Sequence, residues 1–228
     1  MEYREVADEQ RALVAAGKPA GLASGKDCRI HGRFYLNRKM TEAGIGRVLV
    51  ASLHQAIADL LPERLEFYEN WLNPTGLRHG TIGLAPLNAV LSFLREDDHV
   101  YPGVVQLAGR YAAEWTMSAQ GRGRQWLVRF SPRPLRQRAA VSLIRRTVRR
   151  SYAGSRAVVR LRRGRGTVVL RASLFCNVRE AAPAPLCGFY AALVSRLLEL
   201  HRVGTRVEVR TCRAVGDRTC VLDVEAGV

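Results

Sequence analysis

Four of the five cysteines occur in the last quarter of the 228-residue chain, as Cys176, Cys187, Cys212 and Cys220. Thiolates bind zinc tightly, and a structural zinc site needs four ligands arranged as a tetrahedron. Cys187 starts a predicted helix, while Cys212 and Cys220 lie on facing strands of a predicted hairpin, so the three could converge at one end of a sheet. Cys176 or Glu208 could supply the fourth ligand. The spacing therefore indicates a candidate zinc site.

The same cysteines have a second interpretation as packing residues. No Cys-x-x-Cys pair anchors a metal site, and free cysteine commonly behaves as a small buried apolar residue. The N-terminus is acidic and has no hydrophobic segment, so we expect a cytoplasmic protein. In a reducing compartment, cysteines are thiols or metal ligands rather than disulfides. Spacing alone leaves both interpretations open.

Catalytic signatures are sparse. The sequence has no glycine-rich phosphate loop, Gly-x-Ser-x-Gly, His-Glu-x-x-His or dinucleotide fingerprint. The five histidines are scattered without metal-ligand spacing, and His54 falls among the polar positions of a predicted helix, which predicts a surface residue. These patterns favour a non-catalytic protein over an enzyme.

Hydrophobic periodicity predicts helices followed by strands. Apolar residues recur at intervals of three and four from Ile45 to Leu60, which is typical of one helix face. Further helices are predicted over 62–72 and 86–95, from about 101, over 135–149 and over 186–201. Strands are predicted over 157–162, 167–174, 205–211 and 219–224, on either side of the last helix. The order β-β-α-β-β behind four or five helices predicts an α+β fold in which the helices pack on one face of a four-stranded antiparallel sheet.

Domain organisation is simple. Residues 1–40 have weak periodicity and are predicted to form an N-terminal arm, which could contact a partner subunit of a dimer. Residues 41–228 contain no internal repeat and are predicted to form one domain. In the helix that starts near residue 101, Ala108 and Gly109 are small enough to let another element approach closely.

The excess positive charge is confined to one segment. The net charge is +16, and the stretch between Glu114 and Glu180 contains seventeen arginines and no acidic residue. The remainder carries 19 basic and 20 acidic residues. An arginine-rich segment such as 122–171 attracts nucleic acid, anionic lipid or an acidic protein. The alternative is a solvated surface, and for the helix 135–149 core packing is favoured over membrane binding.

The C-terminal pattern resembles a known family. The sequence Pro185-Leu186-Cys187-Gly188-Phe189, followed by Val207-Glu208-Val209, Cys212, Gly216-Asp217 and Cys220, resembles the bacterial 4-vinyl reductase domain. That domain occurs in a protein of bacteriochlorophyll biosynthesis and in sensory domains of aromatic-responsive transcription activators. The resemblance implies the fold of vesicle-tethering TRAPP subunits, with helices on an antiparallel sheet, and it implies a homodimer.

The resemblance also implies a ligand set. In the sensory branch, three cysteines and a glutamate bind zinc beside an aromatic-ligand pocket, and Cys187, Cys212 and Cys220 match the three cysteines. The glutamate position is occupied by Val209, and Glu208 is one residue away, on the opposite face of a strand.

An apolar cavity between helices and sheet is the ligand site that this resemblance implies. Candidate lining residues are aromatic, and core packing is the alternative for most of them; they are Tyr68, Trp71, Phe93, Tyr111, Trp115, Phe189 and Tyr190.

The leading functional hypothesis is a non-catalytic module, acting as carrier, accessory protein or sensor, that binds a hydrophobic, aromatic or tetrapyrrole-like molecule. The alternatives are a tetrapyrrole vinyl reductase and an adaptor that binds polyanions through its arginine-rich segment.

Overall fold

The computed structural model describes residues 44–72, 76, 82–121, 123, 126, 128, 130–178, 180–203 and 205–226, so the predicted arm over 1–40 lies outside the described residues. The helices are α2 (Arg47–Leu60), α3 (Leu65–Glu69), α5 (Leu84–Arg95), α6 (Val100–Ser118), α8 (Arg133–Ser151) and α9 (Gly188–Leu200). Single turns of 3-10 helix are η3 (Pro62–Arg64), η4 (Leu174–Cys176) and η5 (Arg213–Val215). The strands are β1 (Arg156–Arg162), β2 (Arg165–Arg171), β3 (Thr205–Thr211) and β4 (Cys220–Ala226).

The four strands form one antiparallel sheet in the order β1-β2-β4-β3. Its two hairpins are joined along their inner strands, where Val168 pairs with Leu222 and Leu170 with Cys220. The predicted α+β class and four-stranded antiparallel sheet are therefore confirmed among the described residues.

One face of the sheet is buried. Val159, Val168, Leu222 and Val224 share this face and are buried, because alternate residues of a strand point to the same side. The other face carries the alternating positions, which include Arg156 and Arg160 on β1. The sheet thus has an apolar side toward the helices and a charged side away from them.

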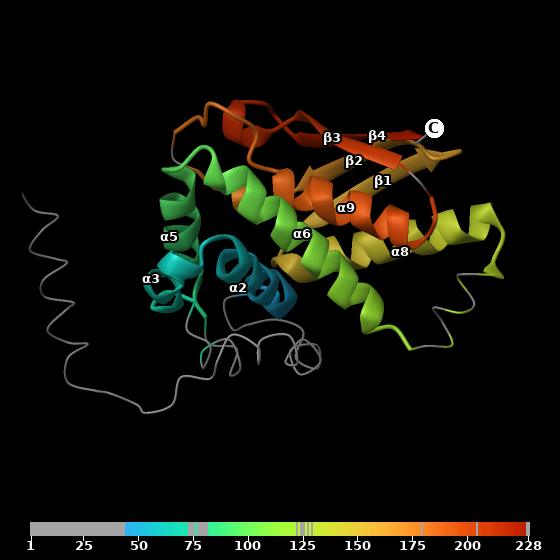
Figure 1. The fold of residues 1–228 in the computed structure, drawn as a ribbon. Coiled ribbons are helices and arrows are strands. Elements are labelled where there is room, and N and C mark those ends of the chain that lie inside the picture. Colours follow the sequence, from blue (N-terminus) through green and yellow to red (C-terminus); the bar gives the residue numbers. More distant parts are fainter. Residues whose placement is uncertain are drawn as a thin grey trace, which may run out of the picture. The chain divides into compact units, whose positions relative to one another are not determined.

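The helices form layers beneath the apolar side of the sheet. Helices α8 and α9 contact β1 and β3 respectively, α6 packs on α9, and α2 packs on α6 (Figure 1). Helices α6 and α9 meet at Gly109, where a Cβ atom would lie 2.3 Å from the Phe189 carbonyl oxygen. The close approach predicted at Gly109 is confirmed, and only a residue without a side chain fits there.

Two predictions from periodicity are wrong in detail. The predicted helix over 62–72 starts at Pro62, as expected, but its first turn is the 3-10 turn η3 and its α-helical part, α3, ends at Glu69. His54 was expected at the surface, but it is buried, and its Nε2 lies 3.1 Å from Glu69 Oε1. Helix α2 is buried on most of its circumference, so its polar positions are enclosed as well.

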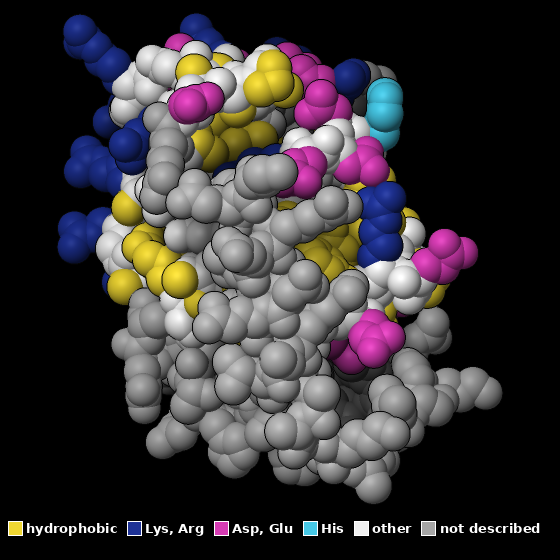
Figure 2. Space-filling view, turned by 90° about the vertical axis from the view of Figure 1, so that its left-hand side faces the viewer, with side chains coloured by type: hydrophobic (Ala, Val, Ile, Leu, Met, Phe, Trp, Pro, Cys, Tyr) yellow, Lys and Arg dark blue, Asp and Glu magenta, His cyan; other side chains and the backbone are white. Residues whose placement is uncertain are grey.

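The charged groups are unevenly distributed over the surface. In the view of Figure 2, most of the visible Lys and Arg side chains project from the left edge, whereas Asp and Glu lie mainly at the top and right. Among the described residues, no helix combines the length and the apolar character needed to cross a bilayer.

Candidate metal centre and ligand groove

The four cysteines come from four different structural contexts at one end of the sheet. Cys176 ends η4, the turn that follows β2, and Cys187 is the N-cap residue of α9. Cys212 directly follows β3, and Cys220 is the first residue of β4. The β3–β4 hairpin places the last two side by side, and the chain reversal before α9 adds the other two.

The four Sγ atoms lie within 4.8 Å of one another and are buried. Cys176 Sγ is 3.1 Å from Cys187 Sγ, 3.4 Å from Cys212 Sγ and 3.5 Å from Cys220 Sγ. Cys187 Sγ and Cys212 Sγ are 3.5 Å apart. All four cysteines are free thiols. The structure therefore brings together the whole predicted ligand set, with Cys176 in the fourth position.

This arrangement fits a tetrahedral metal ion. Around zinc with Zn–S bonds of about 2.3 Å, the sulfurs of a regular tetrahedron are about 3.8 Å apart. The closest pairs here lie between 3.1 and 3.5 Å, so a small outward movement of the sulfurs would admit the ion. Four thiolates in tetrahedral geometry are typical of zinc or of iron bound by sulfur. The cluster could therefore hold a metal ion.

Hydrogen bonds within the cluster separate its thiols into two kinds. The hydrogen bond with Cys176 and those with the other thiols raise the pKa of Cys187, and burial adds to the effect. The hydrogen bonds with Cys176 and Cys187 lower the pKa of Cys212 and of Cys220. The lowered pKa of Cys212 and of Cys220 favours the thiolate, which is the form that binds a metal ion.

Two backbone amide groups make hydrogen bonds around Cys212 and Cys220. The Arg213 amide donates to Cys220 Sγ at 3.3 Å, within the η5 turn that follows Cys212. Asp217 Oδ2 accepts a hydrogen bond from the Cys212 amide at 2.8 Å, which fixes the turn that separates the two cysteines. Such outer contacts orient metal ligands and are part of the site.

Two side chains from the helical layers fix the segments that carry Cys176 and Cys187. Arg95, at the end of α5, donates to the Phe175 carbonyl at 3.0 Å. The Tyr101 hydroxyl, on α6, donates to the Leu186 carbonyl at 3.1 Å. The Arg95 guanidinium also lies 5.8 Å from the centre of the Tyr101 ring, so the two anchors are coupled.

Sequence reasoning missed these anchors, because they act across 80 and 85 residues of chain. No spacing rule links residues that far apart. The proximity of Arg95 to Tyr101 in the sequence was the only available signal.

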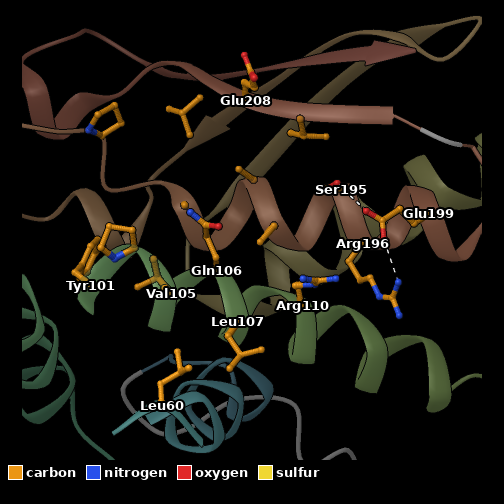
Figure 3. A pocket seen from close by; sticks show the side chains of 18 residues that line it. Leu60, Tyr101, Val105, Gln106, Leu107, Arg110, Ser195, Arg196, Glu199 and Glu208 are labelled. Atoms are coloured by element: carbon orange, nitrogen blue, oxygen red, sulfur yellow. Dashed lines mark hydrogen bonds and ion pairs between the residues drawn. The ribbon is translucent and has the colours of Figure 1, made fainter. Parts of the chain in front are cut away.

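Glu208, the alternative fourth ligand, lies elsewhere. Its carboxylate is exposed and lies 2.7 Å from Arg206 Nε on the same strand. In Figure 3 its side chain points away from α9. Neighbouring Val209 pairs with Leu222 on the apolar side of the sheet. Glu208 and Val209 therefore lie on opposite faces of β3, as the alternation of strand residues predicted.

A groove of about 770 Å³ runs between α6, α9 and the edge strand β3. Its apolar surface includes Val105 of α6, Ala191 and Ala192 of α9, and Val207 and Val209 of β3. This volume is in the range of small-molecule sites, which are mostly apolar and carry a few polar groups.

The charged groups near α6 and α9 include Arg110, Arg196 and Glu199, and Glu208 lies at the β3 side with its carboxylate turned away from α9 (Figure 3). Arg196 is held by two carboxylates, Glu114 at 2.8 Å and Glu199 at 3.0 Å. Arg110 lines the same groove on the neighbouring helix, and it forms no ion pair with any carboxylate in the described part of the chain. The groove therefore offers an apolar surface with one uncompensated guanidinium.

The seven aromatic residues predicted to line a ligand site fall into three groups. Phe189 and Tyr190 are fully buried beside Phe175 in the core. Tyr68, Trp71 and Phe93 belong to an aromatic cluster with Phe67 between α3 and α5. Tyr111 and Trp115 stack on α6, and the Tyr111 hydroxyl donates to Asp59. None of the seven lines the 770 Å³ groove, where the aromatic side chain is that of Tyr101.

No protein-family model, curated protein or solved structure matches the chain.

Proposed function

We propose that the protein is a non-catalytic binding module for a hydrophobic or aromatic small molecule that carries an acidic group, and that zinc bound by Cys176, Cys187, Cys212 and Cys220 stabilises it. The observation that carries the proposal is that the cysteine cluster adjoins two elements that line the groove. Cys187 immediately precedes Gly188, the first groove residue of α9, and Cys212 follows the groove strand β3.

Zinc is the metal that this donor set favours. A closed site of four thiolates leaves no open position for a substrate, which is the mark of a structural rather than a catalytic zinc. An ion that holds the start of α9 to the end of β3 would fix the distance between two walls of the groove. Iron in the same site would differ by its visible absorption, which zinc lacks.

The chemistry of the ligand follows from the groove. Valine and alanine side chains would contact an apolar body, and Arg110 would pair with a carboxylate. A tetrapyrrole with its acidic side chains has this chemistry. The resemblance to the 4-vinyl reductase domain, and through it to TRAPP subunits and their dimers, supports the same class of ligand.

Binding can be tested with protoporphyrin IX as the probe, titrated into the zinc-loaded full chain and followed by fluorescence. The expected result is saturable binding that Ala191→Phe, which fills the groove, abolishes. Ala139→Phe is the matched control, because Ala139 lies on α8 and does not line the groove. Equal binding by both variants would refute the groove as the site.

Two further readouts address the remaining hypotheses. Native mass spectrometry of the full chain measures bound metal and oligomeric state together, and a homodimer with one zinc per chain is expected. Reduction of the vinyl group of a vinyl tetrapyrrole in the presence of a nicotinamide or flavin donor would replace the binding proposal with the reductase.

A further inference from the structure

The arginine-rich half of the molecule forms a second groove that the proposed function does not use. It has a volume of about 570 Å³ and lies between α8 and the edge strand β1. Five arginines line it, and no carboxylate does; they are Arg138, Arg145, Arg146, Arg149 and Arg160. Of these five, only Arg145 has a hydrogen-bond partner in the described part of the chain, the Val159 carbonyl at 2.9 Å.

The charge of this surface is uncompensated. Thirteen arginines occur among the described residues from 130 to 178, and the sequence has no acidic residue between Glu114 and Glu180. None of the thirteen forms an ion pair with a carboxylate of the described residues. Like charges this close repel one another, so an anionic partner would stabilise the surface.

The solvent-facing side of α8 combines these arginines with an apolar residue. At 100° per residue, Leu135, Arg138 and Arg149 point to the same side of the helix, opposite buried Ile144. Leu135 is 49% exposed, although it is a large apolar residue. Just before α8, Trp126 and Phe130 are 61% and 67% exposed, with ring centres 4.8 Å apart. Because the rings of Trp126 and Phe130 contact each other, they form an exposed apolar patch, and such patches are a mark of interaction sites.

We propose that this face of α8, with Phe130 and Leu135 at its start and Arg138 to Arg149 along it, docks on a bilayer that contains anionic phospholipid. The arginines span about 16 Å of helix, so they contact several headgroups rather than one phosphate. Guanidinium groups bind phosphate oxygens through paired hydrogen bonds. Leu135, Phe130 and Trp126 enter the boundary between headgroups and acyl chains.

The exposed side chain of Leu135 distinguishes an anionic bilayer from nucleic acid as the partner. Against nucleic acid, aromatic residues can stack on bases, but an exposed leucine has no comparable partner. At a bilayer, leucine and aromatic side chains both gain from burial. The combination of arginine with exposed leucine therefore favours lipid.

The test is co-sedimentation of the full chain with vesicles of phosphatidylcholine, alone or with about 30 mol % phosphatidylserine. The wild type is expected to sediment only with the anionic vesicles, and less so as salt rises. Each arginine contributes about fivefold to such binding, so Arg138→Gln/Arg149→Gln should lower it about 25-fold. Thermal melts establish that the variants are folded.

A matched control removes the same charge elsewhere. Arg206→Gln/Arg210→Gln lies on β3, at the other edge of the sheet, and its arginines contact Glu208 and Asp223. This control should bind anionic vesicles like the wild type. Equal losses in both double variants would mean that only net charge matters, and would overturn the proposal.

Two further experiments distinguish a bilayer from nucleic acid and from a single phosphate group as the anionic partner. Leu135→Gln leaves the charge unchanged and should still weaken vesicle binding severalfold. If Leu135→Gln binds like the wild type and a single-stranded oligonucleotide displaces the vesicles, the surface belongs to nucleic acid. If inorganic phosphate displaces the vesicles more than sodium chloride of equal ionic strength, it is a site for a single phosphate group. Either outcome overturns the proposal.

Discussion

The Sγ atoms of Cys187 and Cys212 lie 3.5 Å apart, although one residue precedes α9 and the other follows β3. The start of α9 and the end of β3 thus lie close together, next to the groove that both elements line. The distance between these two sulfurs is the simplest measure of whether the metal site and the groove are assembled.

Loss of one thiol should remove the metal. Cys212→Ser replaces a sulfur of the closed set, so we expect bound zinc to fall below one equivalent and the free energy of unfolding to drop by at least about 3 kcal/mol. Metal content and thermal denaturation measure both. Cys28→Ser, which changes the fifth cysteine, is the control and should retain the metal. A Cys212→Ser variant as stable as the wild type would mean that Cys212 is a packed thiol.

Acidification should release the metal. Hydrogen bonds from neighbouring thiols lower the pKa of Cys212 and Cys220 in the folded protein. The two thiolates therefore contribute their full stability at a pH above the pKa of the unfolded state. This contribution is lost as the pH falls through the lower pKa of the folded state. A bound metal shifts the loss further down, because protons compete with it for sulfur. We expect release with a midpoint below the ordinary thiol pKa of about 8.5, measured with a chromogenic chelator. Metal loss on raising the pH from neutrality would contradict this.

Removal of the hydroxyl that anchors Leu186 should loosen the site without deleting a ligand. Tyr101→Phe leaves the Leu186 carbonyl without its donor, at a cost of about 1 kcal/mol, and should weaken zinc binding by about 10-fold or more. Tyr111→Phe on the same helix is the control, because Tyr111 bonds to Asp59 instead. Competition with a chelator of known affinity measures the change. Identical zinc affinities in the two variants would exclude a positioning role for Tyr101.

The crossing of α6 and α9 should be intolerant of a single methyl group. Gly109→Ala places Cβ 2.3 Å from the Phe189 carbonyl oxygen and 3.0 Å from Ala192 Cβ, so the helices must move apart at a cost of about 1–3 kcal/mol. At Gly103, also on α6, the nearest atom would be Leu60 Cδ1 at 3.8 Å, and Gly103→Ala should be neutral or stabilising. Urea denaturation compares the two. Equal effects would contradict the close crossing.

Much of the fold could be predicted because it depends on local patterns. The period of three to four residues predicted α2, α5, α6 and α9, and strand-like segments predicted the four strands. The cysteine cluster could also be predicted from local patterns. Cys212 and Cys220 share a hairpin, and Cys187 starts the helix before it.

The remainder depends on contacts that local patterns do not encode. The burial of His54 follows from elements that enclose α2, and its contact with Glu69 spans 15 residues. Leu135, in the first turn of α8, is exposed, although its apolar character predicted a buried position. The 770 Å³ groove is lined by residues of α6, α9 and β3 that lie far apart in the sequence, and none of the seven aromatic residues that the sequence suggested is among them.

The strand order β1-β2-β4-β3 also constrains how the chain folds. Each hairpin can form from residues that are close in sequence. The pairing of β2 with β4 is different, because α9 and β3 lie between these two strands in the sequence. Pairings this remote in sequence form late, because the intervening loop must first be closed. Cys176 follows β2 and Cys220 begins β4, so their sulfurs meet only at that step. We therefore expect metal capture to be among the last events of refolding, and a nascent chain to acquire its ion only after its final strand has been synthesised.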